Sequence, residues 1–257
     1  MIYDLQKPTV WKRLSAWMFD FIIFAILVTG FATIISTAVN YSQKYDELQS
    51  YYSKYYEDFG IEDITEEKYK KFTQTEKDEY NKTLEKINEL IKNDKRIGEA
   101  SGLVFNLTLI IAAFGILFAV IVWEFVVPLF LKNGQTVGKK IFGIAVMRTN
   151  GVKVSPIQLF VRSVLGKYTF EIMLPVFSII LVFFGGAGVF GILMLGIVLI
   201  AQIVSLISTR KTRSALHDLL SDTVTVDLAS QLIFDSEEEL IKYKEEQHAI
   251  MAERSPY

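Results

Sequence analysis

The sequence predicts an all-α membrane protein: a bundle of four transmembrane helices with a small cytoplasmic β element and an extracellular helical insertion. Composition is the first observation behind this prediction, because 51% of the 257 residues are hydrophobic and the mean hydropathy is +0.31. The second is a set of three long stretches without charge. The third is the uneven distribution of basic residues between these stretches, which predicts an orientation.

The first uncharged stretch covers residues 21–43, more than the roughly 20 residues that cross about 30 Å of hydrocarbon. It extends back to Leu14 if Asp20 is tolerated inside it. Residues 1–39 are therefore expected to form a cytoplasmic N-terminus and the first transmembrane helix.

The other uncharged stretches predict three more transmembrane helices. Residues 100–123 lack charge, and if Glu124 is tolerated the second helix is expected within residues 101–131. Residues 172–209 lack charge too, but one helix of that length would be about 57 Å long at 1.5 Å per residue. The glycine cluster "GGAG" near its middle predicts a reversal, and hence two helices within residues 168–208.

Basic residues predict the orientation of these helices. The loop at residues 132–167 contains no acidic residue but has seven basic ones: Lys132, Lys139, Lys140, Arg148, Lys153, Arg162 and Lys167. Short basic loops stay on the cytoplasmic side of a membrane. Basic residues near the N-terminus and directly after residue 209 agree with this, so both termini are expected in the cytoplasm.

The insertion at residues 40–100 then lies outside. Apolar and aromatic residues recur there at helical spacing, beginning with Tyr41, Tyr45, Leu48 and Tyr52. Gly60 and Gly98 are expected to follow helix ends. Two interpretations remain open for this helical insertion: an exterior spacer with solvated charged faces, or a module that binds a protein partner.

The basic loop has a different periodicity. Ile144, Val146 and Arg148 alternate with their neighbours, "TNG" supplies a turn, and the alternation resumes at Val152, which predicts a β-hairpin. An amphipathic interfacial helix is expected after it, beginning at Pro156. Later, "TVTVDL" is a candidate third strand in a cytoplasmic tail, residues 209–257, expected to be exposed and charged after residue 233.

Three blocks carry a family resemblance: "KRLSAWMFDFII", "NGQTVGKKIFGIAVMRTNGVKVSPIQLFVRSVL" and "RSALHDLLSDTVTV". In order and spacing they resemble the RDD family of bacterial multi-span membrane proteins, whose signature arginine and two aspartates fall on Arg13, Asp20 and Asp218. The family's tail motif has glycine where this chain has Asp222, so a turn that needs glycine there would be affected. The resemblance implies a multi-pass protein of the bacterial plasma membrane, for which ion or small-solute transport is the role most often suggested.

The candidate site contains the charged residues inside the apolar stretches. A charge at the centre of a transmembrane helix costs about 2.5–3.5 kcal/mol on insertion scales, so such residues face the bundle interior or water and find partners. Arg13 and Asp20 are two helical turns apart on one face, and Glu124 is expected at the same depth as Asp20. One interpretation is a satisfied polar cluster that fixes helix packing, with Arg162 and His217 as further partners. The other is a proton or cation site, at which the Asp20 and Glu124 carboxylates exchange one H⁺ or Na⁺.

Nothing in the sequence indicates an enzyme or a cofactor. "GQTVGKK" has three residues between its glycines where a Walker A loop has four, and no strand is expected before "GAGVFG", as a dinucleotide fold would require. The chain has no cysteine and only two histidines, so no metal-ligand spacing occurs. A net charge of -2 gives no reason to expect nucleic acid as a partner.

The leading function hypothesis is therefore transport of H⁺, Na⁺ or a small solute through an intramembrane carboxylate site. Because four helices are few for a secondary transporter, transport would require a homo-oligomer in the lipid bilayer. The rival hypothesis is a non-transporting scaffold or accessory protein that binds a partner through its extracellular insertion or its cytoplasmic face.

Overall fold

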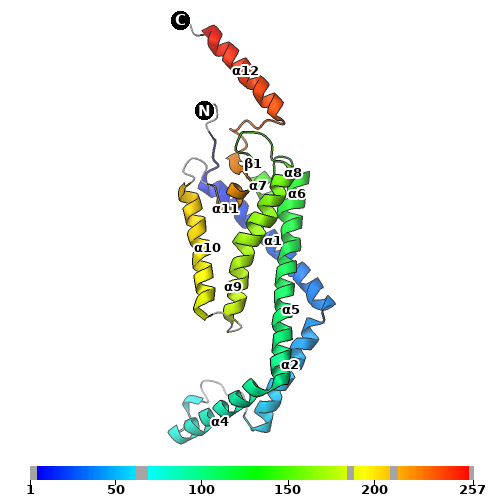
Figure 1. The fold of residues 1–257 in the computed structure, drawn as a ribbon, viewed down its shortest axis with the longest axis vertical. Coiled ribbons are helices and arrows are strands. Elements are labelled where there is room, and N and C mark those ends of the chain that lie inside the picture. Colours follow the sequence, from blue (N-terminus) through cyan, green and yellow to red (C-terminus); the bar gives the residue numbers. More distant parts are fainter. Residues whose placement is uncertain (1–4, 62–68, 184–187, 209–213, 255–257) are drawn as a thin grey trace. The chain divides into compact units, whose positions relative to one another are not determined.

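The computed structural model describes residues 5–61, 69–183, 188–208 and 214–254 (Figure 1). The chain divides into two compact units, one formed by Met1–Ala32 with Ala112–Tyr257 and the other by Thr33–Ile111. Within the described residues, three helical runs are long and apolar enough to cross a membrane, namely Val10–Ala38, Lys95–Phe130 and Pro156–Phe183. The predicted class, a helical membrane protein, is confirmed at this level.

The apolar runs are assembled from several elements. The first is the single helix α1 (Val10–Ala38), and the second comprises α5 (Lys95–Val120), the π-helical segment η1 (Ile121–Val126) and α6 (Val127–Phe130). The third comprises α8 (Pro156–Phe160), the π-helical segment η2 (Val161–Met173) and α9 (Leu174–Phe183). A further apolar helix, α10 (Gly188–Ser208), packs against α9 (Figure 1). The reversal expected between α9 and α10 falls on residues outside the described part of the chain.

One boundary differs from the sequence prediction. The expected interfacial helix and the third transmembrane helix are one continuous helical run, so no break occurs near residue 167. The run begins where expected, since the Ser155 hydroxyl accepts a hydrogen bond from the Gln158 N–H in a capping box and Pro156 occupies the first turn. Gly166 and Pro175 lie within the run without ending it.

The β element has two strands, β1 (Ile144–Arg148) and β2 (Thr223–Asp227), paired antiparallel with Ile144 opposite Asp227. The predicted hairpin is wrong in its main partner, because residues 152–154 contribute only isolated bridges, from Lys153 to Met147 and from Val152 to Phe234. The turn at Gly151 leaves too few residues before Ser155 for a second strand. Alternation in β2 instead buries two valines against β1, and the resulting core comprises Ala145, Met147, Val224 and Val226.

The remaining elements of this unit are two short helices, α7 (Val137–Ile141) and α11 (Leu216–Leu220), and the C-terminal α12 (Glu237–Arg254). The expectation of an exposed tail is wrong at its start. Phe234 is buried with Val152 and Leu240, which fixes the beginning of α12 to the loop after β1. The basic residues at 210, 211 and 213, used to predict orientation, lie outside the described residues.

The second unit contains α2 (Tyr41–Asp58), α4 (Gln74–Asn93) and the first part of α5. Its core comprises Leu48, Ile97 and Val104. Gly60 follows the end of α2 with φ +64°, as predicted for a helix stop. The prediction for Gly98 is wrong: the Asp94 carboxylate accepts the N–H of Arg96 at 2.9 Å, so α5 begins before Gly98 and continues through it.

Candidate functional site

Two cavities of about 240 and 420 Å³ lie in the first unit and share the residues Trp17, Asp20, Glu124, Lys167 and His217. Among the described residues, their walls contain four carboxylates (Asp20, Glu124, Glu171, Asp218) and four basic side chains (Arg13, Lys139, Arg162, Lys167). We call these eight residues and His217 the charged cluster. If all eight are ionised and His217 is neutral, the charged cluster has no net charge.

Asp20 is buried on α1 and binds the beginning of α7. Its carboxylate accepts hydrogen bonds from the Thr136 hydroxyl at 2.5 Å and from the Gly138 backbone N–H at 2.9 Å. Gly138 permits this approach, because a Cβ at that position would lie 2.5 Å from the carbonyl oxygen of Ala16. The Asp20 carboxylate therefore lies against the N-terminal end of α7, where partial positive charge favours an anion.

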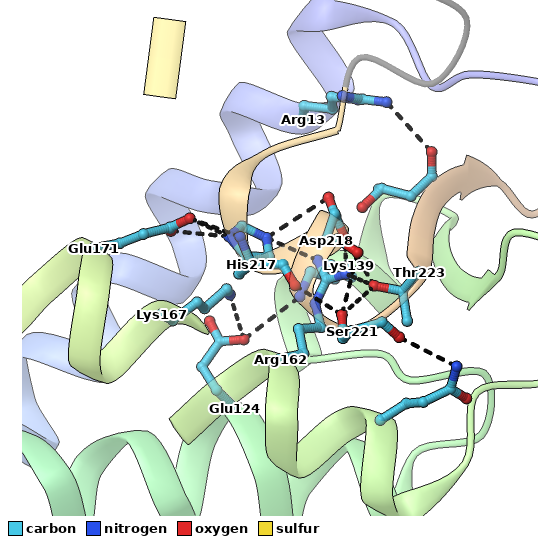
Figure 2. Close-up of polar contacts among 12 residues, drawn as sticks. Arg13, Glu124, Lys139, Arg162, Lys167, Glu171, His217, Asp218, Ser221 and Thr223 are labelled. Atoms are coloured by element: carbon cyan, nitrogen blue, oxygen red, sulfur yellow. Dashed lines mark hydrogen bonds and ion pairs between the residues drawn. The ribbon is translucent and has the colours of Figure 1, made fainter. Parts of the chain in front are cut away.

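Glu124 lies on η1 between two lysines. The Nζ atom of Lys167 is 2.5 Å from its Oε2, and the Nζ of Lys139 is 3.6 Å from the same oxygen (Figure 2). All three side chains are largely buried, with exposed fractions of 14–17%. Burial lowers the pKa of Lys139 to about 8, although the Glu124 carboxylate acts in the opposite direction.

Arg162 connects η2 to α11 and β2. Its Nη1 donates to the Asp218 carboxylate and, at 2.8 Å, to the Thr223 hydroxyl, while Nη2 lies 3.1 Å from Nε2 of His217 (Figure 2). Asp218 also accepts from the Thr223 hydroxyl at 3.1 Å. The buried Arg162 guanidinium thus has an anionic partner inside the protein, as a buried charge requires.

His217 is the neutral member of the charged cluster. Its backbone N–H donates to Glu171 Oε1 at 3.0 Å, and Nδ1 lies 2.8 Å from the same oxygen. An arginine only donates hydrogen bonds, so Nε2 must accept from Arg162 and the ring proton lies on Nδ1, facing Glu171. Burial, together with the nearby Arg162 charge, lowers the pKa of His217 to about 3. Gly166 allows this packing, since a Cβ there would lie 2.6 Å from the Cβ of His217.

Both π-helical segments contribute charged residues to this site. Arg162, Lys167 and Glu171 lie on η2, and Glu124 lies on η1. Residues five apart on an α-helix, such as Arg162 and Lys167, point about 140° away from each other. In a π-helix, residues i and i+5 are hydrogen-bonded and lie about one turn apart, so Arg162 and Lys167 are on the same face of η2.

Proline explains where the π-helical segments end. Pro128 follows Glu124 by four residues, and Pro175 follows Glu171 by four. A proline has no N–H, so the α-helical hydrogen bond to the carbonyl of the residue four positions earlier cannot form. Each π-helical segment ends two residues before its proline. The backbone carbonyls of Glu124 and Glu171 are thus the ones that lack an α-helical hydrogen bond from the residue four positions later.

The predicted site residues do come together in part. Arg162, His217 and Asp218 contact one another, and Arg13 lines the same cavity while its Nη2 donates to the Thr225 carbonyl oxygen at 3.3 Å. Asp20 and Glu124 line one cavity. The described contacts do not join the two carboxylates directly, because each has donors of its own.

Sequence reasoning missed three members of the charged cluster. Lys139 and Lys167 enter the sequence prediction as basic residues of the cytoplasmic loop and not as site residues, and Glu171 is not among the predicted site residues. The four-residue spacing from acid to proline, present at Glu124 and again at Glu171, was the available indication that these acids belong together.

The turn at Asp222 forms without the glycine that the family motif has there. Asp222 adopts φ +51°, a left-handed conformation that aspartate tolerates better than most residues. Its carboxylate accepts a hydrogen bond from the Thr149 hydroxyl at 2.5 Å, and its carbonyl accepts the Thr149 N–H at 3.2 Å. The departure from the motif therefore preserves the connection from α11 to β2.

A family model described as the RDD family matches residues 7–222 of the chain. The matched region includes Arg13, Asp20 and Asp218, and with them the whole charged cluster. Comparison with curated proteins and with solved structures gives no match.

Proposed function

This chain belongs to the RDD family, and we propose that it exchanges a cation such as Na⁺ for protons across a bacterial plasma membrane. The observation that carries the proposal is the cavity lined by both Asp20 and Glu124 in a protein with membrane-length apolar helices. Ionisable groups in such a setting are costly to bury, and where they line a cavity they mark ion and proton pathways. Carboxylate oxygens are also the ligands that hard cations prefer.

The proposed topology has four spans: α1, the run from α5 to α6, the run from α8 to α9, and α10. Basic residues support it, since residues 131–155 between the second and third runs contain no acid and five basic residues: Lys132, Lys139, Lys140, Arg148 and Lys153. In this orientation both termini and the β element are cytoplasmic, and residues 40–100 are outside. Four spans enclose little space, so the transporting form is proposed to be a homo-oligomer.

The test is cation flux by the full chain reconstituted in liposomes, with Na⁺ as the probe and a pH-sensitive dye reporting proton movement. Wild type is expected to move protons against an imposed Na⁺ gradient, and Asp20→Asn and Glu124→Gln are expected to abolish the signal. Asp46→Asn is the matched control, because Asp46 is exposed on α2 and remote in sequence from the charged cluster. Gel filtration of each variant in detergent separates loss of transport from loss of folding.

Absence of flux in the wild type across a wide pH range overturns the proposal. That result would favour the rival function, a non-transporting scaffold that binds a partner through residues 40–100 or through its cytoplasmic face. Normal flux in both Asp20→Asn and Glu124→Gln would remove this cavity from the pathway.

A further inference from the structure

We propose that the larger of the two cavities binds a lipophilic organic cation, in which one positive charge is surrounded by alkyl or aryl groups, and that this ligand enters from the membrane. The proposal concerns binding at equilibrium and does not require transport, so it goes beyond the proposed function. It is carried by the lining, the aromatic rim and the charge of the 420 Å³ cavity.

The first support is the size and the lining of this cavity. Its volume of about 420 Å³ is in the range of pockets that enclose small organic molecules. A hard metal cation is instead surrounded by oxygen ligands. One part of the lining offers no such ligand, because it consists of Trp17, Phe21, Phe24 and Ile172. The larger cavity therefore fits an organic molecule better than a bare metal ion.

The second support is an aromatic rim on α1. Trp17 and Phe21 are about one turn apart, and their rings stack with centroids 5.4 Å apart. They line the cavity although 60% and 53% of their surfaces are exposed, so the cavity is open on this side. In the proposed topology α1 is the first span, and exposed apolar side chains on it face lipid. Because aromatic faces attract organic cations, and tryptophan does so most strongly, this rim favours a cation that arrives through the membrane.

The third support is the difference in charge between the two cavities. Among the described residues, the lining of the larger cavity contains four charged side chains: Asp20, Glu124, Glu171 and Lys167. If these are ionised and His217 is neutral, their net charge is -2, whereas the three carboxylates and four basic side chains of the smaller cavity sum to +1. The larger cavity therefore attracts a cation and repels the phosphate group of a lipid.

The fourth support is that carboxylates of this lining already accept hydrogen bonds from the protein. Asp20 accepts from Thr136 and Gly138, and Glu171 accepts from the backbone N–H and Nδ1 of His217 (Figure 2). A ligand without N–H or O–H groups competes with none of these bonds and is attracted by charge alone. Quaternary ammonium and phosphonium groups meet this condition, whereas a primary ammonium group has three donors that need acceptors.

The probe for the test is tetraphenylphosphonium, and its binding to the full chain in detergent is measured by equilibrium dialysis. Tetraphenylborate is the matched ligand control, because it has the same shape and the opposite charge. Wild type is expected to bind tetraphenylphosphonium saturably, with one site per chain. Tetraphenylborate is expected to bind no more than it does to protein-free detergent.

Two variants test the rim and the charge separately. Trp17→Leu keeps an apolar side chain but loses the aromatic face, and it is expected to weaken binding about 2- to 30-fold, the range of a cation–π contact. Glu171→Gln keeps the shape and an acceptor for His217 but loses the charge, and it is expected to weaken binding by about tenfold or more. The matched controls are Trp11→Leu and Glu245→Gln. Both residues are exposed and line neither cavity, so these variants are expected to bind as wild type.

Gel filtration of each variant separates loss of binding from loss of folding, and Trp17→Phe, which keeps a ring, is expected to bind more tightly than Trp17→Leu. Wild-type affinity in either Trp17→Leu or Glu171→Gln overturns the proposal. Equal binding of tetraphenylborate does so too, because the cavity would then take up apolar molecules, lipid chains included, whatever their charge. Na⁺ flux without saturable binding of tetraphenylphosphonium overturns this inference alone, and saturable binding without Na⁺ flux overturns the proposed function alone.

Discussion

The Arg162–Asp218 pair is expected to contribute more to stability than any exposed ion pair of this protein. Both residues are nearly inaccessible, with 4% and 5% of their surfaces exposed. In Arg162→Met the Asp218 carboxylate loses the guanidinium that pairs with it, and His217 and Thr223 each lose a contact. A side chain of similar length fills the space, so the change removes charge and hydrogen bonds more than volume.

The magnitude follows from the contacts. Two donor interactions of Nη1 are lost, to Asp218 and Thr223, and hydrogen bonds that involve a charged group contribute about 1.5–3 kcal/mol each. Breaking one partner of a buried pair costs about 3–5 kcal/mol overall. Because Thr223 still donates to Asp218, we expect Arg162→Met to lower the free energy of unfolding by about 3–4 kcal/mol.

The assay is unfolding by SDS in mixed micelles, followed by tryptophan fluorescence, for Arg162→Met, Asp218→Leu and the double variant. The double variant should be more stable than Arg162→Met, because it no longer buries an unpaired carboxylate. Arg148→Met is the matched control: Arg148 pairs with Glu237, whose side chain is 60% exposed, so its loss should cost less than about 1 kcal/mol. The reasoning is refuted if Arg162→Met costs no more than Arg148→Met, or if the double variant loses the sum of the two single losses.

Three further predictions use the same unfolding assay. Gly138→Ala should destabilise by about 1–3 kcal/mol, because the added Cβ meets a backbone oxygen that cannot move independently; a neutral effect would contradict the packing of α7 on α1. Asp222→Gly should change the free energy of unfolding by less than about 1 kcal/mol, because glycine adopts the left-handed conformation without strain but loses the hydrogen bond with Thr149. Asp222→Val should cost about 1–2 kcal/mol more than Asp222→Gly. Equal free energies for the two variants would contradict a strained φ at this position. The lowered pKa of His217 predicts that stability falls as the pH drops from about 6.5 to about 3, because the unfolded chain then binds a proton that the folded protein excludes. His217→Gln should reduce this pH dependence. An identical pH profile in the wild type and in His217→Gln would contradict the prediction.

The helical membrane class could be predicted because it depends on local properties. Residues 14–43 and 100–131 are apolar over enough length to require a helix in hydrocarbon, whatever they pack against. The prediction failed at residues 156–167, whose amphipathic pattern is also typical of a helix lying on the membrane surface. Arg162 and Lys167 do not face headgroups there; they face Asp218 and Glu124, residues far away in the sequence.

For the β element too, the positions of the strands follow from the local sequence, whereas their pairing depends on contacts between residues far apart in the chain. The alternation that identifies β1 and β2 is local, and both strands occur within one or two residues of the predicted positions. Their pairing depends on where the chain returns after α10, about 80 residues later. A nearby hairpin partner is the usual expectation, but here the turn at Gly151 is followed at once by the cap of α8, which prevents a second strand.

The partners of Asp20 and Glu124 could not be predicted because equal depth in the membrane does not determine direction around a helix axis. Arg162 and Glu171 are nine residues apart, which is two and a half turns of an α-helix and places them on opposite faces. In the π-helical register of η2 they face the same residue, His217. The prolines four residues after Glu124 and Glu171 remove the hydrogen bonds that would otherwise favour the α-helical register. The two prolines thus help determine which charges meet in the cluster, although neither contributes a polar group to it.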